Sequence, residues 1–185
     1  MIDLTHKGLP DAIMVDGKPF LINTDFRIWL KVDEILKNPD WTLMDIAFVV
    51  KDLTVLDLFQ FESQIQEQLL NFYLNPNSTP NVNELSNSDV VVDYKEDGEY
   101  IYSAFIQAYG IDLLDADMHW HKFLALFRGL PDSTLLVKIM GYRGYKKPKK
   151  GDIYEKYKRI WALPKNQKIT TDMQKELEDL FYGSI

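Results

Sequence analysis

The histidine pair in His119-Trp120-His121 is the part of the sequence best suited to metal chemistry, and Asp115 and Asp117 precede it. Imidazole nitrogens and carboxylate oxygens both bind zinc and other divalent metals. On a helix, however, side chains two residues apart point about 200° away from each other. Because the apolar residues around the pair recur with helical spacing, the two rings are not expected to share a metal ion. We predict no metal site here, with one histidine exposed and the other packed at a helix junction.

Patterns for other kinds of catalysis are missing from the sequence. The chain has no cysteine, which excludes disulfides, thiolate metal sites and cysteine nucleophiles. It contains neither the Gly-x-Ser-x-Gly and His-Glu-x-x-His motifs of hydrolases nor the Gly-x-x-x-x-Gly-Lys and Gly-x-Gly-x-x-Gly phosphate loops. Asp112, Asp115 and Asp117 lie just before a predicted helix, where carboxylates interact favourably with the helix dipole. We therefore expect no enzyme activity, no cofactor and a function carried by surfaces.

The net charge of −7 is distributed unevenly along the chain. Between Lys138 and Lys168 there are 11 Lys and Arg residues but only two acidic residues, Asp152 and Glu155. That segment carries an excess of nine positive charges, which leaves an excess of 16 negative charges for the rest of the chain. Such a distribution favours binding to an oppositely charged surface, including that of a second copy of the chain. The alternative is a solvated basic segment that keeps the protein in solution.

Tyrosines lie between the basic residues of this segment, at positions 142, 145, 154 and 157. Basic surfaces with stacking aromatic rings bind single-stranded nucleic acids. The acidic overall charge and the absence of a helix-turn-helix or RNA-binding signature argue against that function. Nucleic acid is thus the least favoured class of partner, and the alternative is tyrosines packed beside a solvated basic linker.

Neither a signal peptide nor a membrane-spanning segment is predicted. Residues 1–6 are too polar for a signal peptide, and no run of about 18 apolar residues occurs. Hydrophobic residues make up 46% of the chain and aromatic residues 13%, which is enough for a packed core. We expect a folded, soluble protein that does not bind membranes.

The N-terminal half is predicted to contain a β-hairpin followed by helices. Apolar residues on either side of Asp16-Gly17, a strong turn signal, predict a hairpin at residues 12–22. Helical spacing predicts helices at residues 26–38, 40–50 and 61–73, with a turn or short helix at 53–59. Phe48 and Val49 make the second of these helices apolar nearly all round, so it should be the most buried. The breaker-rich residues 75–92 should form a mobile polar loop.

The C-terminal half is predicted to be helical throughout. Apolar spacing indicates helices at about 94–109, 118–127, 135–143 and 152–162, the first ending at Gly110. After a linker, Met173, Leu177, Leu180 and Phe181 have the spacing of one face of a short helix. The predicted fold is therefore mainly α: a compact multi-helix domain at residues 1–162 with a short N-terminal β-hairpin, followed by a C-terminal linker and short amphipathic helix at 163–185.

Several ordered segments share a distinctive pattern. In the second half these are residues 100–113 (YIYSAFIQAYGIDL), 118–123 (MHWHKF), 126–131 (LFRGLP) and 139–143 (IMGYR), and in the first half residues 15–18 (VDGK) and 24–27 (TDFR). In this order they resemble a family of tail-module proteins known only as gene product fifteen, which occurs mainly in phages and prophages of Gram-positive bacteria. The resemblance covers residues 9–160. At His121 the family commonly has a second aromatic residue.

The resemblance implies a role in building the phage tail. Genes of this family typically lie between those for the major tail protein and the tape-measure protein, a position typical of tail assembly chaperones. Such chaperones coat the long helical tape-measure protein and give way to tail-tube subunits. The implied partner is the tape-measure protein, with the major tail protein and a second copy of the chain as further options. The implied location is the cytoplasm of the host bacterium.

We predict that partners contact the basic segment and the apolar stripe of the last helix. The residues of these two surfaces are Arg143, Lys146, Lys147, Lys149 and Lys150 in the first, and Leu177, Leu180 and Phe181 in the second. The alternative function is a structural virion protein, such as a head–tail adaptor or tail-completion protein. A nucleic-acid-binding regulator is the third possible function.

Overall fold

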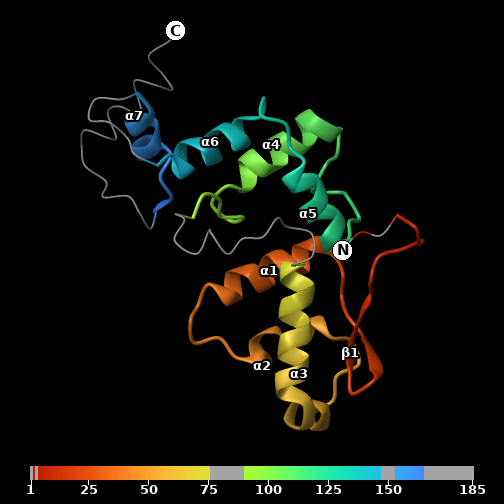
Figure 1. Cartoon of the computed structure of the whole chain (residues 1–185). Helices are drawn as coiled ribbons and strands as arrows, with labels where there is room; N and C mark the ends of the chain where they lie inside the picture. The colour runs from red at the N-terminus through yellow and green to blue at the C-terminus, as the bar shows by residue number, and fades with distance from the viewer. Residues whose placement is uncertain (1, 3, 76–89, 147–152, 165–185) are drawn as a thin grey trace. The chain divides into compact units, whose positions relative to one another are not determined.

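The computed structural model describes residues 2, 4–75, 90–146 and 153–164 (Figure 1). The chain forms two compact units: unit 1 comprises residues 1–84 and 112–129, and unit 2 comprises residues 85–111 and 130–185. Over the described residues both units are built mainly of helices, and one short hairpin supplies the strands, which confirms the predicted fold class. The domain boundary predicted after residue 162 stays a prediction, because residues 165–185 lie outside the described residues. Residues 76–89 of the predicted mobile loop also lie outside them, so that prediction is untested as well.

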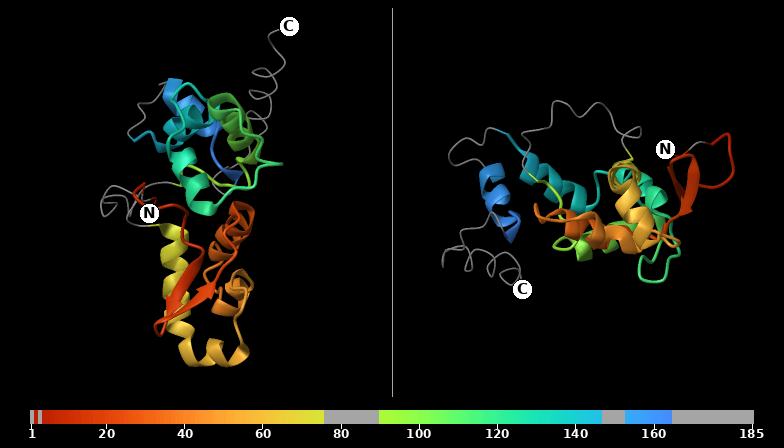
Figure 2. Two further views of the ribbon diagram at one scale, coloured as in Figure 1. Left: turned by 90° about the vertical axis from the view of Figure 1, so that its right-hand side faces the viewer. Right: turned by 90° about the horizontal axis from the view of Figure 1, so that it is seen from below.

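The predicted hairpin is present in unit 1, where β1 (Ala12–Val15) pairs antiparallel with β2 (Lys18–Leu21). Asp16 and Gly17 have positive φ angles of 48° and 72°, as a tight two-residue hairpin turn requires. Along β1, Ile13 and Val15 are buried whereas Met14 is exposed. The buried side of β1 packs against α3 (Val55–Leu74), beside which the hairpin lies in Figures 1 and 2.

The aromatic part of the unit 1 core comes largely from two helices, α1 (Phe26–Leu36) and α5 (Trp120–Arg128). Phe26 stacks on Phe123 with their ring centroids 5.0 Å apart, and the rings of Trp29 and Trp120 are 6.5 Å apart. All four side chains are buried. Because α1 and α5 are far apart in the sequence, this aromatic contact joins the two sequence segments of unit 1.

The prediction of one long and most buried helix at residues 40–50 is wrong. The structure has a single-turn helix α2 (Leu43–Ile46) followed by a 3₁₀ turn, η1 (Ala47–Val49). Leu43, Ile46 and Val49 are buried, but Met44 and Phe48 are exposed to solvent. The segment therefore has one buried side and one exposed apolar side.

Backbone pairing with the chain after the hairpin explains why this helix ends early. Val50 forms an isolated antiparallel bridge with Ile22. Asn23 N donates to Val49 O at 2.7 Å, and Lys51 N donates to Leu21 O at 2.9 Å. Because these backbone groups pair with the extended chain, they cannot continue a helical hydrogen-bond ladder.

The third predicted helix and the short helix before it are one element in the structure. α3 runs from Val55 to Leu74, and a kink at Phe61 (φ −126°, ψ 21°) marks the place where the sequence indicated a break. Ile65, Leu69 and Phe72 are buried beyond the kink. The helix ends at Asn75, whose positive φ of 46° is typical of a helix C-terminus.

Unit 2 contains three described helices that pack in sequence order: α4 (Gly98–Tyr109), α6 (Leu135–Gly144) and α7 (Ile153–Ile160), with α6 contacting both of the others. Gly110, with φ of 64°, ends α4 as predicted. The start of α4 lies later than the predicted residue 94, because the Asp93 carboxylate accepts hydrogen bonds from Lys95 N and Glu96 N and holds this segment in a turn.

Candidate protein-binding surface

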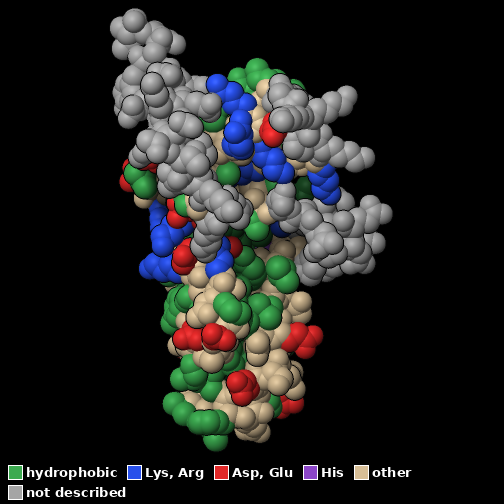
Figure 3. Space-filling model, turned by 90° about the vertical axis from the view of Figure 1, so that its left-hand side faces the viewer, with side chains coloured by type: hydrophobic (Ala, Val, Ile, Leu, Met, Phe, Trp, Pro, Cys, Tyr) green, Lys and Arg blue, Asp and Glu red, His purple; other side chains and the backbone are tan. Residues whose placement is uncertain are grey.

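Five large apolar side chains are exposed within a short stretch of unit 1. Met44 is 66% exposed, Phe48 52%, Val55 67%, Leu56 71% and Phe59 82%. We call these five residues the apolar surface. Figure 3 shows apolar side chains gathered with acidic ones over the lower part of its view, where no Lys or Arg side chain is visible. A contiguous group of exposed apolar side chains is typical of a site that binds another protein.

The fold prevents these side chains from turning inward. Met44 and Phe48 lie four residues apart, on the side of α2 and η1 opposite the buried Leu43, Ile46 and Val49. Val55, Leu56 and Phe59 belong to the first turns of α3, before the kink at Phe61. Residues three and four apart share a helix face, so the three side chains of α3 form one continuous strip.

Two similar capping contacts hold the starts of these helices. The backbone N of Thr42 donates to Asp45 Oδ2 at 2.7 Å, and the backbone N of Thr54 donates to Asp57 Oδ2 at 3.1 Å. The hydroxyl of each threonine donates to the same carboxylate oxygen. Such capping boxes stabilise the first turn of a helix, and here they hold the backbone from which the apolar surface projects.

The same contacts keep both aspartates charged. Hydrogen bonds from the backbone and then the hydroxyl of Thr42 lower the pKa of Asp45 below its usual value. The hydroxyl of Thr54, followed by its backbone N–H, lowers the pKa of Asp57. Both groups therefore carry a negative charge at neutral pH, close to the exposed apolar side chains.

Acidic residues predominate around the apolar surface. Five acidic residues occur between positions 40 and 62, against one basic residue, Lys51: these are Asp40, Asp45, Asp52, Asp57 and Glu62. All except Asp57 are exposed, and Asp57 is partly exposed. The arrangement is suited to binding, because it combines an apolar centre with a charged rim.

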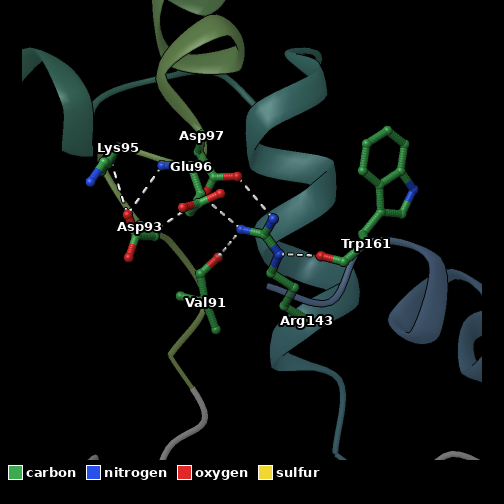
Figure 4. Close-up of polar contacts among 7 residues, drawn as sticks. All are labelled: Val91, Asp93, Lys95, Glu96, Asp97, Arg143 and Trp161. Atoms are coloured by element: carbon green, nitrogen blue, oxygen red, sulfur yellow. Dashed lines mark hydrogen bonds and ion pairs between the residues drawn. The ribbon is translucent and has the colours of Figure 1, made fainter. Parts of the chain in front are cut away.

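Arg143, which was predicted to lie on a basic contact surface, is buried instead. Its guanidinium forms a two-pronged ion pair with Asp97, from Nη1 to Oδ2 at 2.6 Å and from Nη2 to Oδ1 at 2.9 Å (Figure 4). Nη1 also donates to Val91 O at 3.1 Å, and Nε donates to Trp161 O at 2.5 Å. Arg143 therefore joins the segment before α4, the N-cap of α4 and the end of α7, which corrects the expectation of a surface role.

The other predicted contact residues are only partly described. Lys146 is exposed, just after α6. Lys147, Lys149 and Lys150, and the apolar stripe of Leu177, Leu180 and Phe181, lie outside the described residues. Partner binding at these residues stays a prediction.

The sequence contains two signals that bear on the apolar surface. Phe48 and Val49 predict burial on all sides of residues 40–50, because few polar residues there mark a solvent-facing side. The Thr-x-x-Asp pattern at Thr42 and Thr54 is the signature of two helix starts. These two motifs place one helix start at Thr42 and the next at Thr54, so the first helix has to be short. A short helix cannot bury an all-apolar circumference.

The two histidines have separate structural roles. His119 is the N-cap of α5: its Nδ1 accepts from His121 N at 3.0 Å, and its Nε2 donates to Pro10 O at 2.9 Å. His121 is buried, and its Nε2 donates to Phe72 O at 2.8 Å, whereas its Nδ1 has no hydrogen-bond partner. Burial lowers the pKa of His121 to about 4, so the ring is neutral at pH 7. Across the described ranges, no three metal-ligating side chains are grouped as a metal would require.

None of the helices in the described residues combines the length and apolarity needed to cross a membrane. The model of the family described as bacteriophage Gp15 protein matches residues 5–168 of the chain. No curated protein matches the chain, and no solved structure does either.

Proposed function

Because the chain belongs to the bacteriophage Gp15 protein family, we propose that it is a tail assembly chaperone that binds the tape-measure protein and catalyses no reaction. The observation that supports this proposal best is the apolar surface of unit 1, where five large side chains are more than half exposed. A chaperone needs such a surface to cover the apolar stripes of a helical partner before the partner reaches its final neighbours.

The size of the apolar surface suits reversible binding. Complete burial of a large apolar side chain contributes about 1.5–3 kcal/mol, so burying the exposed parts of five residues contributes roughly 5–10 kcal/mol. Association costs about 4–15 kcal/mol in lost translational and rotational freedom. The two terms nearly offset each other, which favours a complex that forms when the partner is present and is later replaced by tail-tube subunits.

The proposal places the protein in the cytoplasm of the host bacterium, where tails are assembled. Under this proposal, the major tail protein competes for the tape-measure protein and displaces the chaperone. A structural virion adaptor is the alternative, and mass spectrometry of purified phage particles separates the two functions. A chaperone is absent from finished particles, whereas an adaptor is present in a fixed number of copies.

Co-expression with the tape-measure protein of the same phage is the direct test. We expect the two proteins to co-purify and the yield of soluble tape-measure protein to rise several-fold. The double substitution Phe48→Ser and Phe59→Ser should abolish this gain, whereas Leu114→Ser should not, although Leu114 is 76% exposed in the link before α5. If the tape-measure protein is equally insoluble with and without the chain, and the two never co-purify, the proposal fails.

A further inference from the structure

The apolar surface of unit 1 is bordered by negative charge, and this restricts what can bind there. Asp52 follows η1 and Glu62 follows the kink of α3 at Phe61, and both side chains are exposed. Lys51 is the single basic residue between positions 40 and 62, and Lys18 of β2 also interacts electrostatically with Asp57; five carboxylates therefore face two lysines. An anionic lipid surface or a nucleic acid would be repelled by this border.

The two capping aspartates add accepting atoms to the border. All the hydrogen bonds that Thr42 and Thr54 donate go to Oδ2 of Asp45 and Asp57. Oδ1 of each carboxylate is therefore able to accept from an incoming ammonium or guanidinium group. Because the capping contacts hold these carboxylates in place, an incoming cation would meet two groups that are already oriented and charged.

The shape of the exposed apolar set favours a helix as the occupant. Val55, Leu56 and Phe59 form a strip along the first turns of α3, and Met44 and Phe48 form a second strip along α2 and η1. These two elements contact each other. Apolar strips of this kind accept the apolar side of an amphipathic helix, whose anchors recur at three- and four-residue spacing.

We propose that the apolar surface binds an amphipathic helix whose apolar stripe is flanked by Lys or Arg, and that this charge pattern selects the segments of the partner that are bound. This inference rests on the proposed function, since it names the kind of tape-measure segment that the chaperone recognises. The apolar side chains provide contact area that does not depend on sequence detail, and the acidic border discriminates between helices of opposite charge.

The test uses two synthetic helical peptides with the same leucine stripe, one flanked by lysines and the other by glutamates. With the full chain, we expect the lysine peptide to bind at least tenfold more tightly in a fluorescence anisotropy titration. Its Kd should rise several-fold between 50 and 500 mM NaCl, because salt screens exposed ion pairs. The double substitution Asp52→Lys and Glu62→Lys should remove the preference, and neither carboxylate caps a helix, so the fold should be preserved.

A matched control applies the same charge change elsewhere in unit 1. Asp115→Lys with Asp117→Lys alters two exposed aspartates in the link before α5 and should keep the preference for the lysine peptide. Equal binding of the two peptides, absence of binding, or loss of preference in the control would each overturn the inference. Sedimentation of the chain without peptide shows whether a second copy of the chain occupies the apolar surface. A stable dimer that must dissociate before the peptide can bind would also contradict the inference. Co-purification with the tape-measure protein in the absence of any peptide preference would leave the proposed function in place while this inference fails.

Discussion

The buried ion pair between Arg143 and Asp97 offers the sharpest test of how unit 2 is held together. The side chain of Arg143 is 8% exposed and that of Asp97 is 1% exposed. Replacing Arg143 with methionine keeps most of the apolar length of the side chain but removes the guanidinium. The Asp97 carboxylate then remains buried without its counter-ion, and the carbonyl groups of Val91 and Trp161 lose their donor.

The size of the effect follows from the asymmetry of buried charge pairs. Removing one partner of such a pair costs about 3–5 kcal/mol, because the remaining charge is desolvated without compensation. Asp97→Asn in the unmodified chain should also destabilise unit 2, since it removes the charge opposite Arg143. In the Arg143→Met background, however, Asp97→Asn should stabilise unit 2 by roughly 1–3 kcal/mol, because the unpaired charge is removed while the side chain can still accept from Asp93 N.

Hydrogen exchange followed by mass spectrometry measures this change for each unit separately. Where exchange of the α4 and α6 amides requires opening of unit 2, a loss of 3–5 kcal/mol accelerates it by roughly 100- to 3,000-fold. The amides of α1 and α3 in unit 1 are the internal control and should be unaffected. An acceleration below tenfold in Arg143→Met, or a further acceleration when Asp97→Asn is added to it, would refute the reasoning.

Three further predictions concern stability and are read by chemical unfolding. Thr54→Ala removes the cap of α3 and should cost about 1 kcal/mol; an unchanged unfolding midpoint would show that the capping box contributes nothing. Gly110→Ala should cost about 1 kcal/mol, because φ at this position is 64°. Gly98→Ala, in the first turn of the same helix with open space at its Cβ position, should be neutral or stabilising, and equal losses at the two glycines would contradict the backbone argument. Finally, the pKa of His121 is about 4 in the folded chain against an ordinary value of 6.5, so the unfolded chain takes up the proton first. The contribution of His121 to stability should therefore be constant above pH 6.5 and fall by up to about 3 kcal/mol between pH 6.5 and 4. The measured fall in stability should be smaller in His121→Phe; an equal fall in both proteins would rule out His121 as a source.

Local signals in the sequence predicted most of the secondary structure. Asp16-Gly17 specifies a hairpin turn because only a few residue types accept two successive positive φ angles. Gly110 ends α4 for the same conformational reason. The helical spacing of Phe26, Trp29 and their neighbours identified α1, because one face of that helix is buried. These predictions succeeded where the information lies within a few residues along the chain.

Long-range contacts decided the points at which the predictions differ from the structure. The helix expected at 40–50 is shortened because Val50 pairs with Ile22, a residue on the hairpin side of the chain. Arg143 is buried because Asp97, 46 residues earlier in the sequence, meets it across α4 and α6. No local sequence pattern at Ile22 or Asp97 predicts which residue it pairs with.

The sequence by itself determined the class of fold, the family, and the absence of cysteine chemistry, since these depend on composition, spacing and ordered motifs. Only the tertiary structure decided which apolar residues face solvent and which charges are internal. Burial is a property of contacts between distant segments: Phe48 is exposed because its short helix has one side to bury, and Arg143 is internal because a carboxylate and two carbonyl groups converge on it.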